Sequence, residues 1–128
     1  MTWWTRVRRT CGGDVSLSIS THVLDTARGR PAEGVPVVLE RADGDGWARV
    51  GSGSTDGDGR LRDLVPDGSP VTEGRHRLTF DTGAYFRSAG VRAFYPEVSV
   101  VFVVESGEDH YHVPLLLNPY GYSTYRGS

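Results

Sequence analysis

The sequence predicts an all-β protein, an antiparallel β-sandwich of seven or eight strands with one short helix. Two observations lead to this fold class. Apolar residues recur with a period near two along most of the chain, and Gly, Pro, Asp and Ser bound each such run. The 128 residues are enough for one domain with a single core. Many short strands between turn residues are typical of a sandwich.

The regular pattern begins at residue 16, so we expect residues 16–128 to form the domain. Residues 1–15 contain two adjacent tryptophans and three arginines, and we interpret them as an N-terminal extension that is expected to be disordered. The alternative is that Trp3 and Trp4 pack against a partner. The extension contains no apolar stretch of signal-peptide length, which argues against export.

The strands are expected, in chain order, over residues 17–25, 35–42, 47–55, 59–64, 74–81, 97–106 and 110–118. In the first strand, Ile19 and Val23 share one face and His22 lies on the other, so His22 is predicted to point away from the core. An Asp-Gly-Asp-Gly stretch between the second and third strands is a strong turn signal. The helix is expected over 82–90, with Thr82 as its N-cap and a glycine at its end.

Composition excludes several classes of protein. The formal net charge is -2 and no basic block is present, so nucleic acid is not an expected partner. The longest apolar runs are far shorter than a membrane span, so no membrane is expected either. The one cysteine, Cys11, cannot form an intrachain disulfide and indicates a reducing compartment. We therefore expect a cytoplasmic protein.

Histidines and arginines are the candidates for chemistry. His110 and His112 form an H-x-H pattern on a strand, which directs both imidazoles to one face for metal binding or proton transfer. His22 lies on another outward face, and Arg60 follows a turn where its guanidinium group could hold an anion. For each of these residues, the alternative is an ordinary surface side chain with no role in catalysis or binding. His76, on a strand that resembles a solvent-exposed one, is interpreted as structural.

Four stretches stand out in order: the strand pair at 20–41, the arginine turn at 55–64, the strand block at 94–104 and the C-terminal stretch at 110–128, which ends in Tyr-Arg-Gly-Ser. Together they resemble the 5-hydroxyisourate hydrolases of the transthyretin-like protein family. The resemblance covers roughly residues 16–128 without large insertions. One departure is Asn118, where the family usually has serine.

The resemblance implies which residues form the site. His22, Arg60 and His112 match the catalytic residues of the family. The matching substrate-binding residues are Ser123, Tyr125, Arg126, Gly127 and Ser128. The family needs no metal and no cofactor, and its members are homotetramers with sites shared between subunits.

The resemblance also implies a reaction. It is the hydrolysis of 5-hydroxyisourate, a cyclic amide of urate degradation, to 2-oxo-4-hydroxy-4-carboxy-5-ureidoimidazoline by attack of a histidine-activated water on a ring carbonyl. His112 is the expected base, and His22 is expected to orient it or to donate a proton. Two alternatives are a non-catalytic transthyretin-like small-ligand carrier and a structural sandwich in which His110 and His112 bind zinc.

Overall fold

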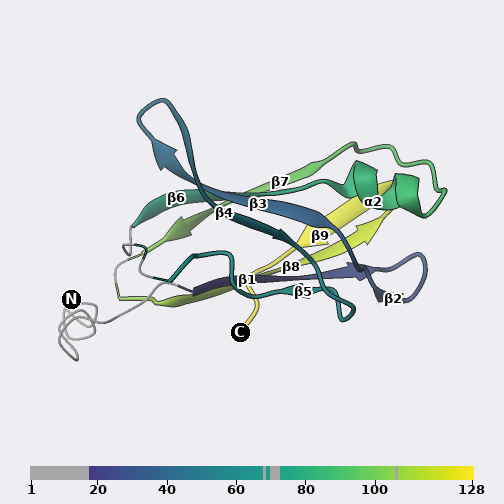
Figure 1. Cartoon of the computed structure of the whole chain (residues 1–128), viewed down its shortest axis with the longest axis horizontal. Helices are drawn as coiled ribbons and strands as arrows, with labels where there is room; N and C mark the ends of the chain where they lie inside the picture. Colours follow the sequence, from purple (N-terminus) through teal and green to yellow (C-terminus); the bar gives the residue numbers. More distant parts are fainter. Residues whose placement is uncertain (1–17, 68, 70–72, 106) are drawn as a thin grey trace.

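The computed structural model describes residues 18–67, 69, 73–105 and 107–128. Figure 1 shows two layers of strands that lie face to face, with the short helix α2 at one end. Over the described residues this confirms the predicted all-β sandwich. The predicted extension over residues 1–15 lies outside them.

The first sheet is built around β1 (Ser18–Asp25), which pairs with β8 (His110–Asn118) and with two short strands, β2 (Arg30–Pro31) and β5 (Arg60–Leu61). β9 (Gly121–Thr124) completes the sheet on the other side of β8. β1 and β8 run parallel, so the antiparallel pairing predicted for the sandwich does not hold at this one pair. Parallel neighbours need a long connection, and here the whole second sheet lies between them in the chain.

The second sheet is antiparallel, in the order β4 (Gly46–Ser54), β3 (Pro36–Asp43), β6 (Gly74–Phe80) and β7 (Val98–Val104). β3 and β4 form a hairpin at the predicted Asp-Gly-Asp-Gly turn. The alternation of apolar residues predicted these four strands to within a few residues. β3, β6 and β7 each bury residues of one face, whereas β4 has none that is fully buried.

Two short strands of the first sheet were not predicted. β2 has two residues and both are exposed, so no apolar alternation marks it. β9 has four residues, of which three are exposed. The strand expected over 59–64 shrinks to the two residues of β5. The short segments are strands because of the neighbours they pair with and not because of their own sequence.

Helix α2 (Thr82–Ser88) follows β6 directly. The predicted N-cap is wrong by one residue, because Asp81 accepts the hydrogen bond from the Ala84 N–H through Oδ1 at 3.0 Å. An aspartate at this position satisfies a free amide of the first turn as well as a threonine would. Gly90, with φ of 70°, lies just beyond the helix end, as predicted.

The core lies between the two sheets. The largest fully buried side chains are those of Phe80, Ile19, Leu39, Leu64, Leu78, Leu115, Leu117, His76, Val23, Val35, Val37 and Val98. His76 therefore does not belong to a solvent-exposed face, and that part of its reading is wrong. It lies on the inner face of β6, with its ring 5.9 Å from that of Phe102. In the part of the chain that the structure describes, no helix is long and apolar enough to cross a membrane.

Candidate active site

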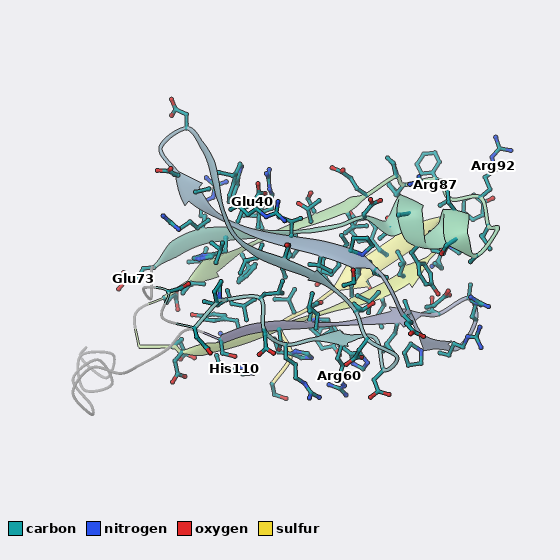
Figure 2. All side chains as sticks on the ribbon, in the orientation of Figure 1. Glu40, Arg60, Glu73, Arg87, Arg92 and His110 are labelled. Atoms are coloured by element: carbon teal, nitrogen blue, oxygen red, sulfur yellow. The ribbon has the colours of Figure 1, made fainter. Side chains whose placement is uncertain are left out.

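The pairing of three strands brings the predicted catalytic residues together. In the antiparallel pair of β1 and β5, His22 lies opposite Arg60. In the parallel pair of β1 and β8, Ser20 lies opposite His112, two residues from His22 on the same face. Residues that are far apart in the sequence thus share the outer face of the first sheet. In Figure 2, Arg60 and His110 lie on this side of the molecule, and Glu40 lies on the opposite side.

A cavity of about 320 Å³ opens on this face. Its lining consists of Ser18, Ser20, Thr21, Arg60, Arg62, Asp63, His110, His112 and Ser128. Three strands and the C-terminus contribute to it, and most of the lining side chains are polar or charged. Such a cavity suits a small polar ligand rather than an apolar one.

His112 is half-buried and lines this cavity. Its Nδ1 is 2.8 Å from the Ser20 hydroxyl oxygen, which leaves Nε2 as the other ring nitrogen available for chemistry. Burial lowers the pKa of the His112 imidazole below its ordinary value. Repulsion from the positive charges of His22, Arg60 and His110 acts in the same direction. His112 is therefore neutral near pH 7 and able to accept a proton.

His22 has a different environment. Its Nε2 is 2.9 Å from the backbone carbonyl oxygen of Asp58. Because a carbonyl oxygen only accepts, Nε2 of His22 carries the hydrogen and donates it. His22 thus connects β1 to the turn that precedes Arg60, and its Nδ1 is the nitrogen that lacks a hydrogen in the neutral ring.

The turn before Arg60 is tightly constructed. Asp56 accepts hydrogen bonds from the amides of Asp58 (2.9 Å) and Arg60 (3.0 Å) through Oδ1. The bond from the Arg60 amide is the main reason that the pKa of Asp56 is lowered. Gly59 has φ of 77°, and a Cβ there would lie 2.4 Å from the Val23 carbonyl oxygen. Only glycine fits this contact, which places Arg60 beside β1.

The C-terminal residues divide between two places. Ser128 lines the cavity, and the Gly127 amide donates to the His112 carbonyl oxygen at 2.8 Å. Tyr125 and Arg126 line a second, more apolar cavity of about 250 Å³ between β7 and β8. There the Arg126 guanidinium lies 4.7 Å from the centre of the Tyr111 ring. Ser123 lies in β9, where it pairs with Leu116 of β8, and its side chain is exposed.

The sequence reading missed several residues of the lining: Ser18, Ser20, Thr21, Arg62 and Asp63. Strand alternation could have found some of them. Arg60 and Arg62 are separated by one residue, and Leu61 between them packs towards the core. An extended chain places such i and i+2 residues on one face. Asp63 has no comparable signal in the sequence.

The histidine pair was also considered as a metal site. His110 Nδ1 is 3.1 Å from the Ser18 hydroxyl oxygen, an arrangement that repeats the one at His112. Among residues 18–67, 69, 73–105 and 107–128, no group of three or more His, Cys, Asp or Glu side chains is arranged to hold a metal ion. A zinc site usually has three or four protein ligands.

Known proteins resemble this chain over most of its length. The 5-hydroxyisourate hydrolase of Salmonella typhimurium is 48% identical over 110 residues, which are 86% of this chain and 80% of that protein. The mouse 5-hydroxyisourate hydrolase is 42% identical over 115 residues, which are 88% of this chain and 97% of that protein.

Solved structures resemble it in fold as well. The structure of Klebsiella pneumoniae 5-hydroxyisourate hydrolase matches with a TM-score of 0.76 at 41% identity, over 88% of this chain and 99% of that one. Sea bream transthyretin in complex with thyroxine matches with a TM-score of 0.79 at 31% identity, over 85% and 93% of the two chains. The sequence pattern of the HIUase/Transthyretin family matches residues 19–127. From the fold, the outer face of the first sheet and these similarities together, we conclude that the chain belongs to the HIUase/Transthyretin family.

Proposed function

We propose that this protein is a cyclic amide hydrolase that converts 5-hydroxyisourate to 2-oxo-4-hydroxy-4-carboxy-5-ureidoimidazoline, a step of urate degradation. The similarity to several 5-hydroxyisourate hydrolases supports the substrate. The observation that supports catalysis most directly is the neutral, partly buried His112 at a cavity that also contains Arg60.

In the proposed mechanism, His112 is the base. Its Nε2 removes a proton from a water molecule as the water oxygen forms a bond to the ring carbonyl carbon. A lowered pKa keeps this nitrogen unprotonated near neutral pH, so the base is available in most molecules. The carbonyl π electrons move to the oxygen, which becomes an oxyanion.

Arg60 stabilises that oxyanion. Its guanidinium group is permanently charged and lines the same cavity as His112. When the oxyanion collapses, the ring C–N bond breaks, and the leaving nitrogen takes up the proton that His112 has received. The acyl carbon ends as a carboxylic acid, which releases its proton to solvent and becomes a carboxylate near pH 7. A well-placed hydrogen-bond donor to the oxyanion, the role proposed for Arg60, contributes about 3 kcal/mol to transition-state stabilisation.

His22 has the orienting role in this proposal. Its hydrogen bond to the Asp58 carbonyl connects it to the Arg60 turn, so that it determines where the guanidinium group lies. Ser128 lines the cavity and is the C-terminal residue with the most direct access to substrate. Four other C-terminal residues do not line this cavity: Ser123, Tyr125, Arg126 and Gly127. We propose that they act on substrate through neighbouring residues or in a site completed by another subunit. No metal or cofactor takes part in the proposed reaction.

We also propose a homotetramer in the cytoplasm. β7 and β9 are edge strands of their sheets, and an exposed edge can pair with another chain. Several large apolar side chains are exposed nearby, among them Val103 (56%) and Tyr125 (58%). Patches of this kind mark interfaces between subunits. The single cysteine of the sequence supports the cytoplasmic location.

The alternative is a non-catalytic small-ligand carrier, since sea bream transthyretin shares the fold. Two histidines and two arginines at a polar cavity are of no use to a carrier of apolar ligands. The test is a stopped-flow absorbance assay on freshly generated 5-hydroxyisourate, compared with its spontaneous decay. We expect a large acceleration. Decay at the spontaneous rate, with 5-hydroxyisourate bound by the protein, would support the carrier.

A further inference from the structure

Two serine–histidine pairs span the parallel strands β1 and β8. Ser18 lies opposite His110 and Ser20 opposite His112, and in each pair the hydroxyl oxygen faces Nδ1 of the ring. The pairs differ in burial. Ser18 and His110 lie in an exposed contact with a distance of 3.1 Å, whereas Ser20 is 8% exposed and its oxygen is 2.8 Å from His112 Nδ1.

A buried hydroxyl is a better positioning group than an exposed one. Water competes more strongly for the exposed Ser18 pair than for the partly buried Ser20 contact. The next residue of β1 adds to the restraint, since the Thr21 hydroxyl donates to the Val113 carbonyl oxygen at 2.6 Å. Two successive β1 side chains therefore contact two successive residues of β8, His112 and Val113.

The C-terminus restrains the same ring from another direction. The Gly127 amide donates to the His112 carbonyl oxygen at 2.8 Å. A Cβ at Gly127 would lie 2.6 Å from His112 Cδ2 and 3.3 Å from Cγ, so the glycine backbone packs against the edge of the imidazole. The ring cannot turn towards the tail, and Nδ1 already has a partner. The nitrogen that remains for the cavity is Nε2.

We propose that Ser20 is a positioning residue that accepts the Nδ1 hydrogen of His112, and that it thereby keeps the Nε2 lone pair directed into the cavity as the base. This inference rests on the proposed function. A neutral imidazole has one hydrogen, so a hydrogen at Nδ1 leaves Nε2 free to take a proton from water. Without Ser20, the ring can adopt the other tautomer, in which Nε2 is a donor and not a base.

The first test needs no substrate. In ¹⁵N-labelled wild-type protein, two-dimensional NMR at a pH above the His112 pKa distinguishes the protonated from the unprotonated ring nitrogen. The proposal expects a protonated Nδ1 and an unprotonated Nε2, with His112 assigned by comparison with the His112→Asn variant. The opposite tautomer would overturn it, whether or not the protein hydrolyses 5-hydroxyisourate. A wild type without activity but with this tautomer would instead count against the proposed function alone.

The second test is kinetic. Ser20→Ala is expected to lower kcat by about tenfold or more with KM changed by less than about twofold, because the hydrogen bond orients the base and does not bind substrate. Ser20→Thr keeps the hydroxyl and is expected to restore most of kcat. Circular dichroism and thermal unfolding establish that each variant is folded.

The pH profile separates positioning from a purely structural role. A hydroxyl that accepts from Nδ1 stabilises the imidazolium more than the neutral ring, because a charged donor makes the stronger bond. Its loss should therefore move the acid limb of the kcat/KM profile to lower pH in Ser20→Ala. A shift to higher pH would mean that Ser20 donates to Nδ1. No shift, with activity lost in proportion to folded protein, would show a structural role. Either result overturns the proposal.

Ser18→Ala is the matched control, since it removes the same group from the exposed pair. It should leave the His112 nitrogen resonances and the acid limb unchanged. An equal shift in both variants would show that the effect belongs to the strand pair and not to the Ser20 hydroxyl.

Discussion

His22 and Arg60 lie opposite each other in the pairing of β1 with β5, and His22 also holds the carbonyl oxygen of Asp58, two residues before Arg60. A histidine of β1 therefore contacts the turn that carries Arg60, and the proposed role of His22 is to orient that turn. A histidine in this position can have one of two roles: it can transfer a proton, or it can orient a neighbouring residue.

Substitution of His22 can separate the two roles. The side-chain amide of glutamine can donate a hydrogen bond much as Nε2 of histidine does, but it cannot transfer a proton. If His22 orients the Arg60 turn, His22→Gln should keep more activity than His22→Leu, with the difference about tenfold. Steady-state kinetics on both variants provide the measurement. Equal and complete loss in the two would indicate proton transfer instead.

Arg60 is predicted to act on the oxyanion. Arg60→Glu reverses the charge at the cavity and should lower kcat/KM by a factor of about 10²–10³ or more. Arg60→Lys keeps the charge but not the planar pair of donors, so some activity should remain. Rates measured for the three proteins under one set of conditions decide this. A lysine variant as fast as the wild type would show that guanidinium geometry does not matter.

Arg62 lies on the same face as Arg60 and provides a matched comparison. Its side chain lines the cavity, but the residue that lies opposite His22 in the strand pairing is Arg60 and not Arg62. Arg62→Gln should therefore change KM more than kcat, through weaker attraction of a polar ligand. A fall in kcat as large as that of Arg60→Glu would contradict this division of roles.

His112→Asn should remove most catalysis while the fold and the proposed tetramer remain. Asparagine can keep a donor near the Ser20 hydroxyl, which is 2.8 Å from Nδ1 in the wild type, but it has no atom in place of Nε2. The variant therefore loses the base and little of the packing. Turnover assays and size-exclusion chromatography are the checks. His110→Asn, in the exposed pair, should cause a much smaller loss, and near-normal turnover of His112→Asn would exclude an essential base there.

Stability should fall in acid because of His76. Burial is the main cause that lowers its pKa in the folded protein; the nearby Arg41 charge adds to this, and the hydrogen bond to the Gly74 carbonyl opposes it. A folded-state pKa below the unfolded value means that the unfolded chain binds more protons between the two pKa values. The free energy of unfolding therefore decreases as pH falls below about 6.5, by at most about 1.4 kcal/mol per pH unit.

The variant that tests this is His76→Leu, which replaces the buried imidazole by an apolar side chain of similar size that does not titrate. Urea unfolding at pH 7 and pH 5 gives the free energies. The decrease between these values should be smaller in His76→Leu than in the wild type. His112 has a lowered pKa as well, so part of the decrease should persist. An unchanged decrease in His76→Leu would mean that His76 does not account for any of it.

The sequence predicted the long strands well because each buries a regular row of apolar residues, as Ile19 and Val23 do in β1. The outward direction of His22 followed from the same alternation. The parallel pairing of β1 with β8 could not be predicted, because strand order depends on contacts between distant segments. For the same reason Ser20 was missed: its role depends on a partner 92 positions away. His76 was misjudged because the arginines beside it describe the outer face of β6 and not the inner one.

The C-terminal four residues are predicted to be required for hydrolysis but not for folding. β9 ends at Thr124, and the Thr124 hydroxyl donates to the Pro114 carbonyl oxygen at 2.7 Å, so the sheet keeps its last strand when Tyr125–Ser128 are deleted. Deletion removes the Gly127 contact with His112 and takes Ser128 from the cavity.

The ion pair of Arg126 with Glu108 is also lost in this deletion, but it is exposed and contributes little, at most about 1 kcal/mol. Activity should therefore fall by at least about 10²-fold with a small change in thermal stability. Gly127→Ala tests the contact alone: its methyl group would meet the His112 ring at 2.6 Å and displace it, which should lower kcat with the cavity otherwise intact. Size-exclusion chromatography beside the assay separates this from an interface role. Loss of the tetramer together with activity would favour an interface, and full activity in the truncated protein would refute any catalytic part for the tail.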